Sequence, residues 1–282
     1  MAAVIRVIGE ALVDVVSGAD GAEHVELGGA PFNTARAIAR LGGDVEFVGS
    51  ISTDERGDRL DAALRADGVD VVHAVRTPLP TTAAHAAVAA DGGARYEFRL
   101  AGTSAPALTA SDLEALPGSP HAVFTGGLAL VADPLASAIG PALRAVDATV
   151  PVMIDLNARP AAIGEGMDRY LDVVRDVVGR ATVLKVSDED LDVVGRDGDA
   201  VAAARGLLEA GPSVVLVTAG ADGSTIVTAS DVRHVPAAPP PGPVVDTIGA
   251  GDAFDGAFLH WLVTHDITPE RLRAPDAAEL IR

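Results

Sequence analysis

The chain of 282 residues suits one large α/β domain, and its 49% of hydrophobic residues supply enough apolar side chains for a core. A formal net charge of −19 argues against nucleic acids and anionic membranes as partners. The absence of cysteine excludes disulfides and thiolate chemistry. We see no apolar run long enough to cross a bilayer and no signal peptide, so we expect a cytoplasmic protein.

The first hundred residues combine strands with two helices. Short apolar runs bounded by turn residues predict strands. The expected strands lie at 4–8, 11–16, 24–27, 45–50, 69–72, 83–90 and 94–99. One helix is expected from Pro31, a residue that suits a first helical turn, to Leu41, and another from Asp54 to Ala66.

From Thr109 onward, strands and helices alternate. The expected strands lie at 121–125, 151–156, 181–186 and 213–218, with helices near 134–146, 166–178 and 199–210. Short apolar strands that alternate with helices indicate a parallel sheet covered on both faces. Ligands of such sheets bind at the carboxyl ends of the strands. The predicted fold class is therefore α/β.

One stretch, Asp-Thr-Ile-Gly-Ala-Gly-Asp-Ala-Phe at 246–254, follows a proline-rich segment and opens an apolar helical run. Gly249 and Gly251 allow a tight turn and a close approach by a ligand, and Ala250 adds little bulk. The free N–H groups and the positive dipole end of the new helix then form an anion site. Asp252 at its edge can take a proton from a hydroxyl that attacks a phosphate. The alternative is an ordinary helix cap with Asp252 as a first-turn acid.

Two other glycine-rich phosphate motifs are excluded. A Rossmann fingerprint fails because Phe254 stands where the third glycine belongs, and the stretch lies near the end of the chain. A P-loop fails because Lys185, the only lysine, does not follow a Gly-x-x-x-x-Gly pattern.

The stretch at 246–254 resembles the second signature of the ribokinase-like family, the phosphofructokinase-B-type sugar kinases. Gly-Gly-Ala-Pro-Phe-Asn at 28–33, followed by Ala-Arg-Ala-Ile-Ala-Arg-Leu-Gly at 35–42, resembles the first signature. The resemblance implies one domain over 1–282, a ribokinase-like three-layer α/β/α sandwich with a mainly parallel central sheet. It also implies a small β lid made from segments at about 11–27 and 82–99.

The resemblance assigns roles to individual residues. Asp252 is the implied catalytic base, with Gly249, Ala250 and Gly251 as the anion hole. The implied sugar-binding residues are Asp14, Gly28, Gly29, Asn33, Arg99, Asn157 and Arg159. The implied nucleotide-binding residues are Lys185, Ser187, Thr218, Gly220 and Gly223. Glu189 and Asp190 would organise Mg²⁺ through water, although Ser187 and Asp190 depart from the family's Asn-x-x-Glu pattern.

The implied reaction moves the γ-phosphoryl group of ATP to a sugar hydroxyl, with Mg²⁺ on the phosphates and a monovalent cation near Asp246 and Ile248. Fructose is the favoured sugar, because a Gly-Glu-x-x-x-Asp pattern ending at Asp14 is typical of fructokinase-like members. Arg159 and Arg99 favour 2-keto-3-deoxygluconate instead, since guanidinium groups bind carboxylates well. A solvated loop and an ordinary hairpin face are the structural alternatives for these two arginines.

Three further expectations concern partners and the chain end. The implied partners are a small-molecule sugar, ATP and a second copy of the chain that pairs through the lid. A non-catalytic sugar or nucleotide sensor of the same fold is the alternative of another class. The family has a further helix that helps to enclose the adenine, whereas this sequence stops at Arg282, so we expect either a longer chain or an incomplete adenine pocket.

Overall fold

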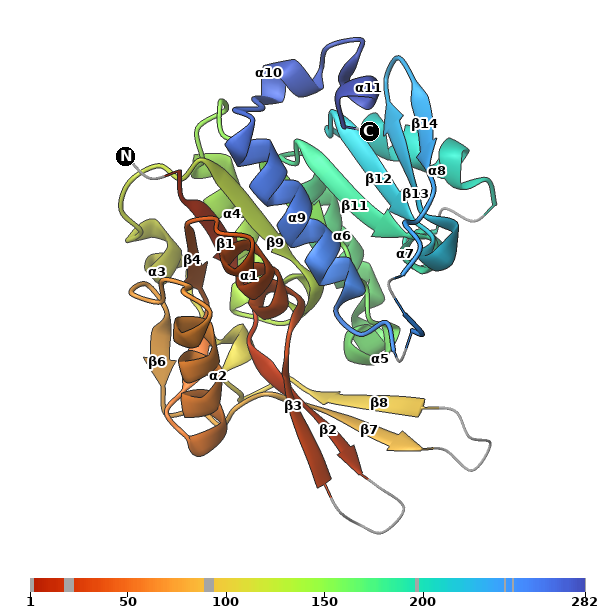
Figure 1. Ribbon diagram of the computed structural model, residues 1–282. Coiled ribbons are helices and arrows are strands. Elements are labelled where there is room, and N and C mark those ends of the chain that lie inside the picture. The colour runs from red at the N-terminus through yellow and green to blue at the C-terminus, as the bar shows by residue number, and fades with distance from the viewer. Residues whose placement is uncertain are drawn as a thin grey trace.

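The computed structural model describes residues 3–17, 23–88, 94–195, 198–240, 242–244 and 246–281. An eight-stranded sheet in the order β14-β13-β12-β11-β10-β9-β1-β4 forms its centre (Figure 1). The strands are β1 (Ile5–Ile8), β4 (Val45–Val48), β9 (Ala122–Gly126), β10 (Val152–Asp155), β11 (Val183–Ser187), β12 (Val214–Thr218), β13 (Ser224–Thr228) and β14 (Val232–Val235). Neighbouring strands from β4 to β12 are parallel, and β13 and β14 add an antiparallel edge.

Helices cover both faces of this sheet (Figure 1). One face carries α1 (Ala30–Arg40), α2 (Glu55–Ala66), α9 (Ala250–Thr264), α10 (Pro269–Leu272) and α11 (Ala277–Ile281). The other carries α3 (Ala110–Glu114), α4 (Leu135–Ala145), α6 (Met167–Val178), α7 (Asp188–Val193) and α8 (Ala200–Leu208). This arrangement confirms the predicted three-layer α/β/α sandwich.

The sequence explains the two cores. Along β10, Val152 and Ile154 join the core cluster that contains α4 and α6, while Met153 joins the cluster that contains α1 and α9. Successive side chains of a strand point to opposite faces, so a strand covered on both sides is apolar throughout. In α1, Phe32 and Ile38 are fully buried because they lie on the stripe that faces the sheet and α9.

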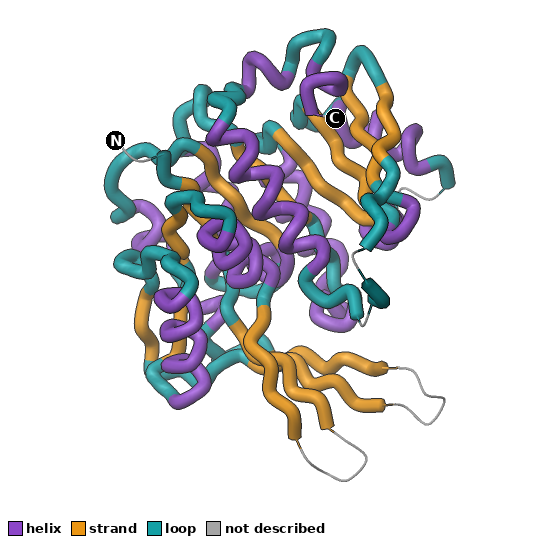
Figure 2. The backbone as a smooth tube through the Cα atoms, viewed as in Figure 1, coloured by secondary structure: helices purple, strands orange, loops and turns teal. Residues whose placement is uncertain are grey.

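A second sheet, β3-β2-β7-β8, projects from the main body (Figure 2). Its strands are β2 (Leu12–Ser17), β3 (Glu23–Gly28), β7 (Ala83–Val88) and β8 (Ala94–Arg99). β2 pairs parallel with β7, and each also pairs antiparallel with its neighbour in sequence. These strands fall in the segments expected to form the lid, and the turn expected at 91–93 lies outside the described residues. Among the side chains that the structure describes, the apolar contacts of this sheet form two small clusters, around Leu12 and around Val13.

Two sequence-based assignments need correction. The strand predicted at 69–72 is wrong, because the segment makes a single bridge from Asp70 to Glu46. The strand predicted at 45–50 divides at Gly49 into β4 and β5 (Ser50–Ser52), and β5 pairs with β6 (Val75–Thr77). A Cβ on Gly49 would lie 2.4 Å from the carbonyl oxygen of Gly9, so two backbones meet there. Among the described residues, no helix is long and apolar enough to cross a membrane.

Candidate active site

The helix α9 begins with a left-handed turn at the carboxyl end of the sheet. Gly249 has φ 76° and ψ 2°, a conformation that favours glycine. The N–H of Ala250 donates to the carbonyl oxygen of Thr247 at 3.1 Å and closes the turn. The N–H groups of Gly251 and Asp252 come too early in the helix to have an intrahelical acceptor. These two amides are therefore free to bind an anion. Of the predicted anion hole of Gly249, Ala250 and Gly251, the amide of Ala250 is already used in the turn, whereas that of Gly251 is free.

Asp252 is held by the other signature stretch. Its Oδ2 accepts a hydrogen bond from Nδ2 of Asn33 at 2.8 Å, and its carbonyl oxygen accepts one from Oγ1 of Thr34 at 3.4 Å. Both donors belong to α1, which packs directly on α9 (Figure 1). A Cβ on Gly256 of α9 would lie 2.6 Å from Cβ of Ala37, so the two helices touch at backbone distance.

The environment tunes Asp252 as a base. The pKa of this carboxyl is raised to about 6, first by burial and then by the nearby Asp155 carboxylate. The hydrogen bond from Asn33 and the positive charges of Lys185 and Arg159 oppose this rise in pKa. Asp252 is therefore ionised at neutral pH, and its pKa lies close to the range in which a general base works best.

The predicted sugar-binding residues Asp14 and Gly28 lie on β2 and β3 of the second sheet. A Cβ on Gly28 would lie 2.4 Å from Oδ2 of Asp14, so a side chain at this position would displace the carboxylate. Burial raises the pKa of Asp14; the Arg159 guanidinium opposes the rise and Glu26 adds to it. Arg159 also lowers the pKa of Asp252. The positive charge of one guanidinium therefore acts on both carboxylates.

The remaining sugar candidates differ in how they are placed. Gly29, with φ 109°, lies against the backbone of Glu10 and opens α1. Asn157 follows β10 with φ 38°, a conformation that asparagine tolerates well. The side chain of Arg99 on β8 is 72% exposed and pairs with Glu97 at 3.1 Å. The structure thus does not bring Arg99 to the base.

Glu10, just after β1, holds the turn that follows β9. Its two carboxylate oxygens accept the N–H groups of Leu128 and Ala129, at 3.2 and 3.0 Å, in the turn η2 (Gly127–Leu130). Burial raises the pKa of Glu10 to about 7, although these backbone hydrogen bonds oppose the rise in pKa. Glu10 therefore joins β1 to the segment after β9.

The predicted nucleotide residues follow β11 and β12. Ser187 caps α7, and Oγ1 of Thr218 donates to the carbonyl oxygen of Val186 at 3.4 Å. Gly220 and Gly223 have φ of 51° and 93°, so glycine is favoured at both positions. Lys185 is buried and its Nζ lies 2.7 Å from Oδ2 of Asp155. The predicted nucleotide contact of Lys185 stays a prediction.

The two predicted metal residues are placed differently. Glu189 is exposed in the first turn of α7. Asp190 is buried, and its oxygens accept the backbone N–H groups of Ala158 at 2.7 Å and Ser187 at 2.8 Å. Asp190 thus caps α7 and fixes the loop after β10. Water-mediated binding of Mg²⁺ by this pair stays a prediction.

Sequence reasoning missed two carboxylates beside the base. Within the described part of the chain, a single group of three acids could hold a metal ion: Asp155, Asp252 and Asp255. The ammonium of Lys185 already lies among them, which argues against a resident cation. The available signal was an aspartate at the end of an apolar strand and another one helical turn after Asp252.

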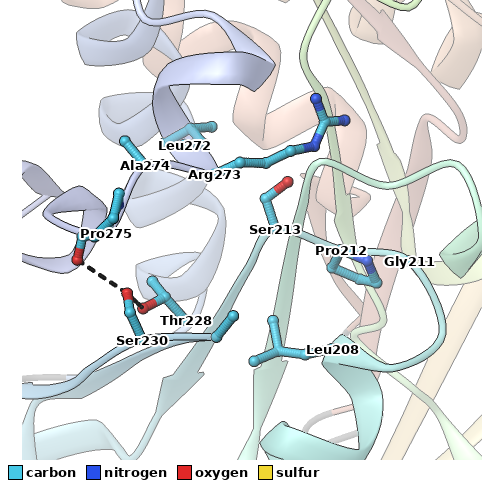
Figure 3. A pocket seen from close by; sticks show the side chains of 11 residues that line it. Leu208, Gly211, Pro212, Ser213, Thr228, Ser230, Leu272, Arg273, Ala274 and Pro275 are labelled. Carbon is cyan, nitrogen blue, oxygen red and sulfur yellow. Dashed lines mark hydrogen bonds between the residues drawn. The ribbon is translucent and has the colours of Figure 1, made fainter.

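A cavity of about 490 Å³ lies at the other end of the sheet (Figure 3). Residues before β12, after β13 and after α10 line it, including Ser213, Ser230 and Arg273. None of the described residues that line this cavity carries a carboxylate, and Asp252 is not among them.

Comparison with known proteins identifies the family. Residues 3–278 match the sequence model of the pfkB family of carbohydrate kinases. The chain belongs to this family. It is therefore a phosphotransferase that acts on a sugar hydroxyl, which confirms the enzyme class predicted from the two signatures.

The individual relatives are kinases of different substrates, so they do not identify the sugar. The kinase is 33% identical over 244 residues to a fructokinase of Rhizobium leguminosarum bv. trifolii, covering 86% of this chain and 74% of that protein. It is 30% identical to the aminoimidazole riboside kinase of Salmonella typhimurium, over 91% and 80% of the two chains. It also resembles the structure of a Vibrio cholerae fructokinase with fructose, ADP and calcium, at TM-score 0.82 and 26% identity, covering 99% and 90% of the two chains.

Proposed function

We propose that the kinase is an ATP-dependent fructokinase that uses Asp252 as its general base. The observation that carries this proposal is the contact between the two signature stretches. Asn33 of α1 fixes the Asp252 carboxylate at 2.8 Å, next to the free amides of the α9 turn. A proton acceptor and an anion site side by side are what phosphoryl transfer to a hydroxyl requires.

The roles follow from this geometry. Asp252 takes the proton from the attacking sugar hydroxyl, and the N–H groups of Gly251 and Asp252 hold the negative charge of the transferring phosphoryl group. Gly28, Asp14 and Asn33 orient the sugar from the lid side, with Asn157 and Arg159 on the opposite wall. The nucleotide approaches over Ser187, Thr218, Gly220 and Gly223. Little covalent chemistry is left to the protein, so positioning supplies most of the rate enhancement.

We expect Mg²⁺ to enter the site bound mainly to the phosphates of the nucleotide. Mg²⁺ keeps several waters and binds substrate phosphates with one or two carboxylates. Glu189 is exposed at the carboxyl end of β11 and can accept hydrogen bonds from metal-bound water, whereas the oxygens of Asp190 already accept backbone N–H groups. Bound Mg²⁺ would neutralise phosphate charge. A monovalent cation near Asp246 and Ile248 is part of the same proposal.

Charge favours fructose over an acid sugar. The guanidinium of Arg159 is a positive charge that acts on both the Asp14 and the Asp252 carboxylates. An anionic substrate such as 2-keto-3-deoxygluconate would meet an excess of negative charge there. Arg99, the other expected carboxylate partner, pairs with Glu97. Aminoimidazole riboside is the second candidate, because a kinase named for it is 30% identical to this chain.

A sugar panel tests the proposal. ADP release is measured with the purified kinase, ATP and Mg²⁺ on fructose, aminoimidazole riboside and 2-keto-3-deoxygluconate. We expect kcat/KM to be highest for fructose. Arg159→Lys loses the planar fork, and we expect it to change the KM for fructose and for the acid sugar by similar factors.

Three results would contradict parts of the proposal. A higher kcat/KM for aminoimidazole riboside than for fructose would identify aminoimidazole riboside as the substrate. A KM for the acid sugar that rises far more than that for fructose in Arg159→Lys would assign Arg159 to a substrate carboxylate. Binding of sugar without turnover of any panel member would favour the sensor. Pairing of two copies through the lid is a separate proposal, tested by the mass of the protein in solution.

A further inference from the structure

Charged side chains meet beneath the first turn of α9, where the helix faces the ends of β10 and β11. Nζ of Lys185 lies 2.7 Å from Oδ2 of Asp155 and 3.5 Å from Oδ2 of Asp255. One carboxylate oxygen from each of Asp155, Asp252 and Asp255 lies within 4.8 Å of the other two. The side chains of Asp155 and Asp255 are 1% and 0% exposed, so water screens their charges little.

The ammonium of Lys185 touches the catalytic turn itself. A Cβ on Gly251 would lie 3.1 Å from Nζ, so the ammonium is packed directly against the turn that carries the anion-site amides. Lys185 is also the only lysine among the 21 Lys and Arg residues of the chain. An ammonium is a compact point charge, whereas a guanidinium is a wide planar fork. The space between this turn and two carboxylates suits the compact group.

The charges of this cluster do not balance if every acid is ionised. Three carboxylates and one ammonium would leave two net negative charges in a buried site, which is costly. Asp155 has the ammonium and Asp252 has the amide of Asn33. No residue that the structure describes donates a hydrogen bond to either oxygen of Asp255 or to Oδ1 of Asp155. A proton on Asp255 removes one charge and supplies the missing donor.

We propose that Asp255 is a positioning residue that stays protonated while Asp252 is ionised, so that Asp155, Lys185 and Asp255 form a neutral unit beneath the base. The only net charge then lies on Asp252. An ionised Asp255 would instead repel the Asp252 carboxylate and keep the base protonated at neutral pH. The inference rests on the proposed role of Asp252 as the base.

The electrostatics agree with this placement of the proton. Burial raises the pKa of Asp255 well above its ordinary value, and Asp155 raises it further, while Lys185 only partly opposes the rise in pKa. The groups that face Asp252 come from every element packed around it: Asn33 of α1, Asp155 of β10, Arg159 after β10, Lys185 of β11 and Asp255 of α9.

Infrared spectroscopy and kinetics of the Asp255→Asn variant test the proposal. A protonated carboxylic acid has a C=O stretching band that a carboxylate lacks. We expect the parent protein to keep such a band at pH 8.5, and we expect Asp255→Asn to lose it. Asparagine is neutral and similar in shape, so the acid limb of the kcat/KM profile should stay within about half a pH unit of the parent.

An ionised Asp255 gives different results in both measurements. The parent then lacks the C=O stretching band of a protonated acid at pH 8.5, and Asp255→Asn removes a negative charge close to the base. The acid limb then moves to lower pH by about one unit or more. Either observation overturns the proposal. This test is distinct from the test of Asp252 as the base. If Asp252 is not the base, the Asp252→Asn variant keeps near-normal turnover.

Glu10→Gln is the matched control, because Glu10 is another buried acid. Its pKa is about 7, so its band should disappear between pH 6 and pH 8.5, and Glu10→Gln should leave the persistent band in place. Should Asp255→Asn fail to fold, the parent spectrum still decides. A band that persists at pH 8.5 in both the parent and Glu10→Gln supports the proposal, and its absence overturns it.

Discussion

At the scale of single residues, burial governs Asp252 more than the helix dipole does. The helix N-terminus and nearby cations favour an ionised carboxylate. The structure adds burial, with 8% of the residue exposed, and the pKa rises to about 6. Because a base must be deprotonated to act, kcat/KM should fall as the pH drops through about 6.

Asp252→Asn isolates proton transfer from binding. Asparagine keeps the shape of the side chain but cannot accept the proton, so we expect kcat to fall by about 10²–10⁴-fold. Nucleotide affinity, measured by ADP titration, should be kept or improved, since a negative charge beside the phosphates is lost. Asp266→Asn, an exposed change just beyond the end of α9, should leave both quantities unchanged. Turnover near the parent rate in Asp252→Asn would reduce Asp252 to a helix cap.

Glu10 predicts a pH dependence of stability. Its pKa is about 7 in the folded protein and 4.5 ordinarily, so the folded state binds more protons between these values. The free energy of unfolding should therefore decrease as the pH rises from about 4.5 to above 7. Denaturant unfolding of the parent and Glu10→Gln at pH 5 and pH 8 measures this. The difference between the two proteins should change by roughly 1–3 kcal/mol, and a difference independent of pH would contradict the assignment.

At the scale of elements, the contact between α1 and α9 assembles the site. Gly256→Ala places a methyl group 2.6 Å from Cβ of Ala37, so the helices must separate. We expect a loss of about 1–3 kcal/mol in the free energy of unfolding and a lower kcat, because the Asn33–Asp252 hydrogen bond depends on the same contact.

Gly166→Ala is the matched control for this change. Gly166 is exposed, and a Cβ there would meet no atom within 4 Å. Its φ of −84° suits alanine. The control should keep both stability and kcat. If Gly256→Ala behaves like the control, close helix packing does not hold the base in place.

The lid sheet should move more than the central sheet. The described side chains of its strands β2, β3, β7 and β8 form small apolar clusters, whereas the central strands are buried on both faces. Hydrogen exchange measured by mass spectrometry should therefore be faster in the lid strands without sugar and should slow when fructose binds. Exchange in these strands that no accepted sugar changes would rule out closure over the substrate.

At the scale of the whole molecule, the sequence predicted the layers well and the edges poorly. The apolar strands alternate with helices, and that rhythm specifies a covered parallel sheet. The edge hairpin of β13 and β14 was missed, because Ser-Thr-Ile-Val-Thr and Val-Arg-His-Val are short and lie outside the rhythm. The strand predicted at 69–72 failed because only Asp70 finds a bridging partner.

The site could be predicted where a local motif carries it and not where tertiary packing does. The anion turn and Asp252 follow from residues that are neighbours in sequence. The cluster of Asp155, Lys185 and Asp255 forms only when two strands and a helix pack together. No local sequence pattern predicts that packing. The resemblance to known kinases gave Asn33 a sugar-binding role and Asp252 the role of base, but the hydrogen bond between them is a feature of the fold.

The pairing of α1 with α9 also has a consequence for synthesis on the ribosome. Asn33 and Asp252 are 219 positions apart. At about 5–20 residues per second, α1 emerges on the order of 10 to 40 s before α9. Throughout that interval the side of α1 around Ala37, which packs on Gly256, waits without its partner. Slower translation lengthens this exposure, so a chaperone that shields the nascent chain should raise the yield of folded kinase most when elongation is slow.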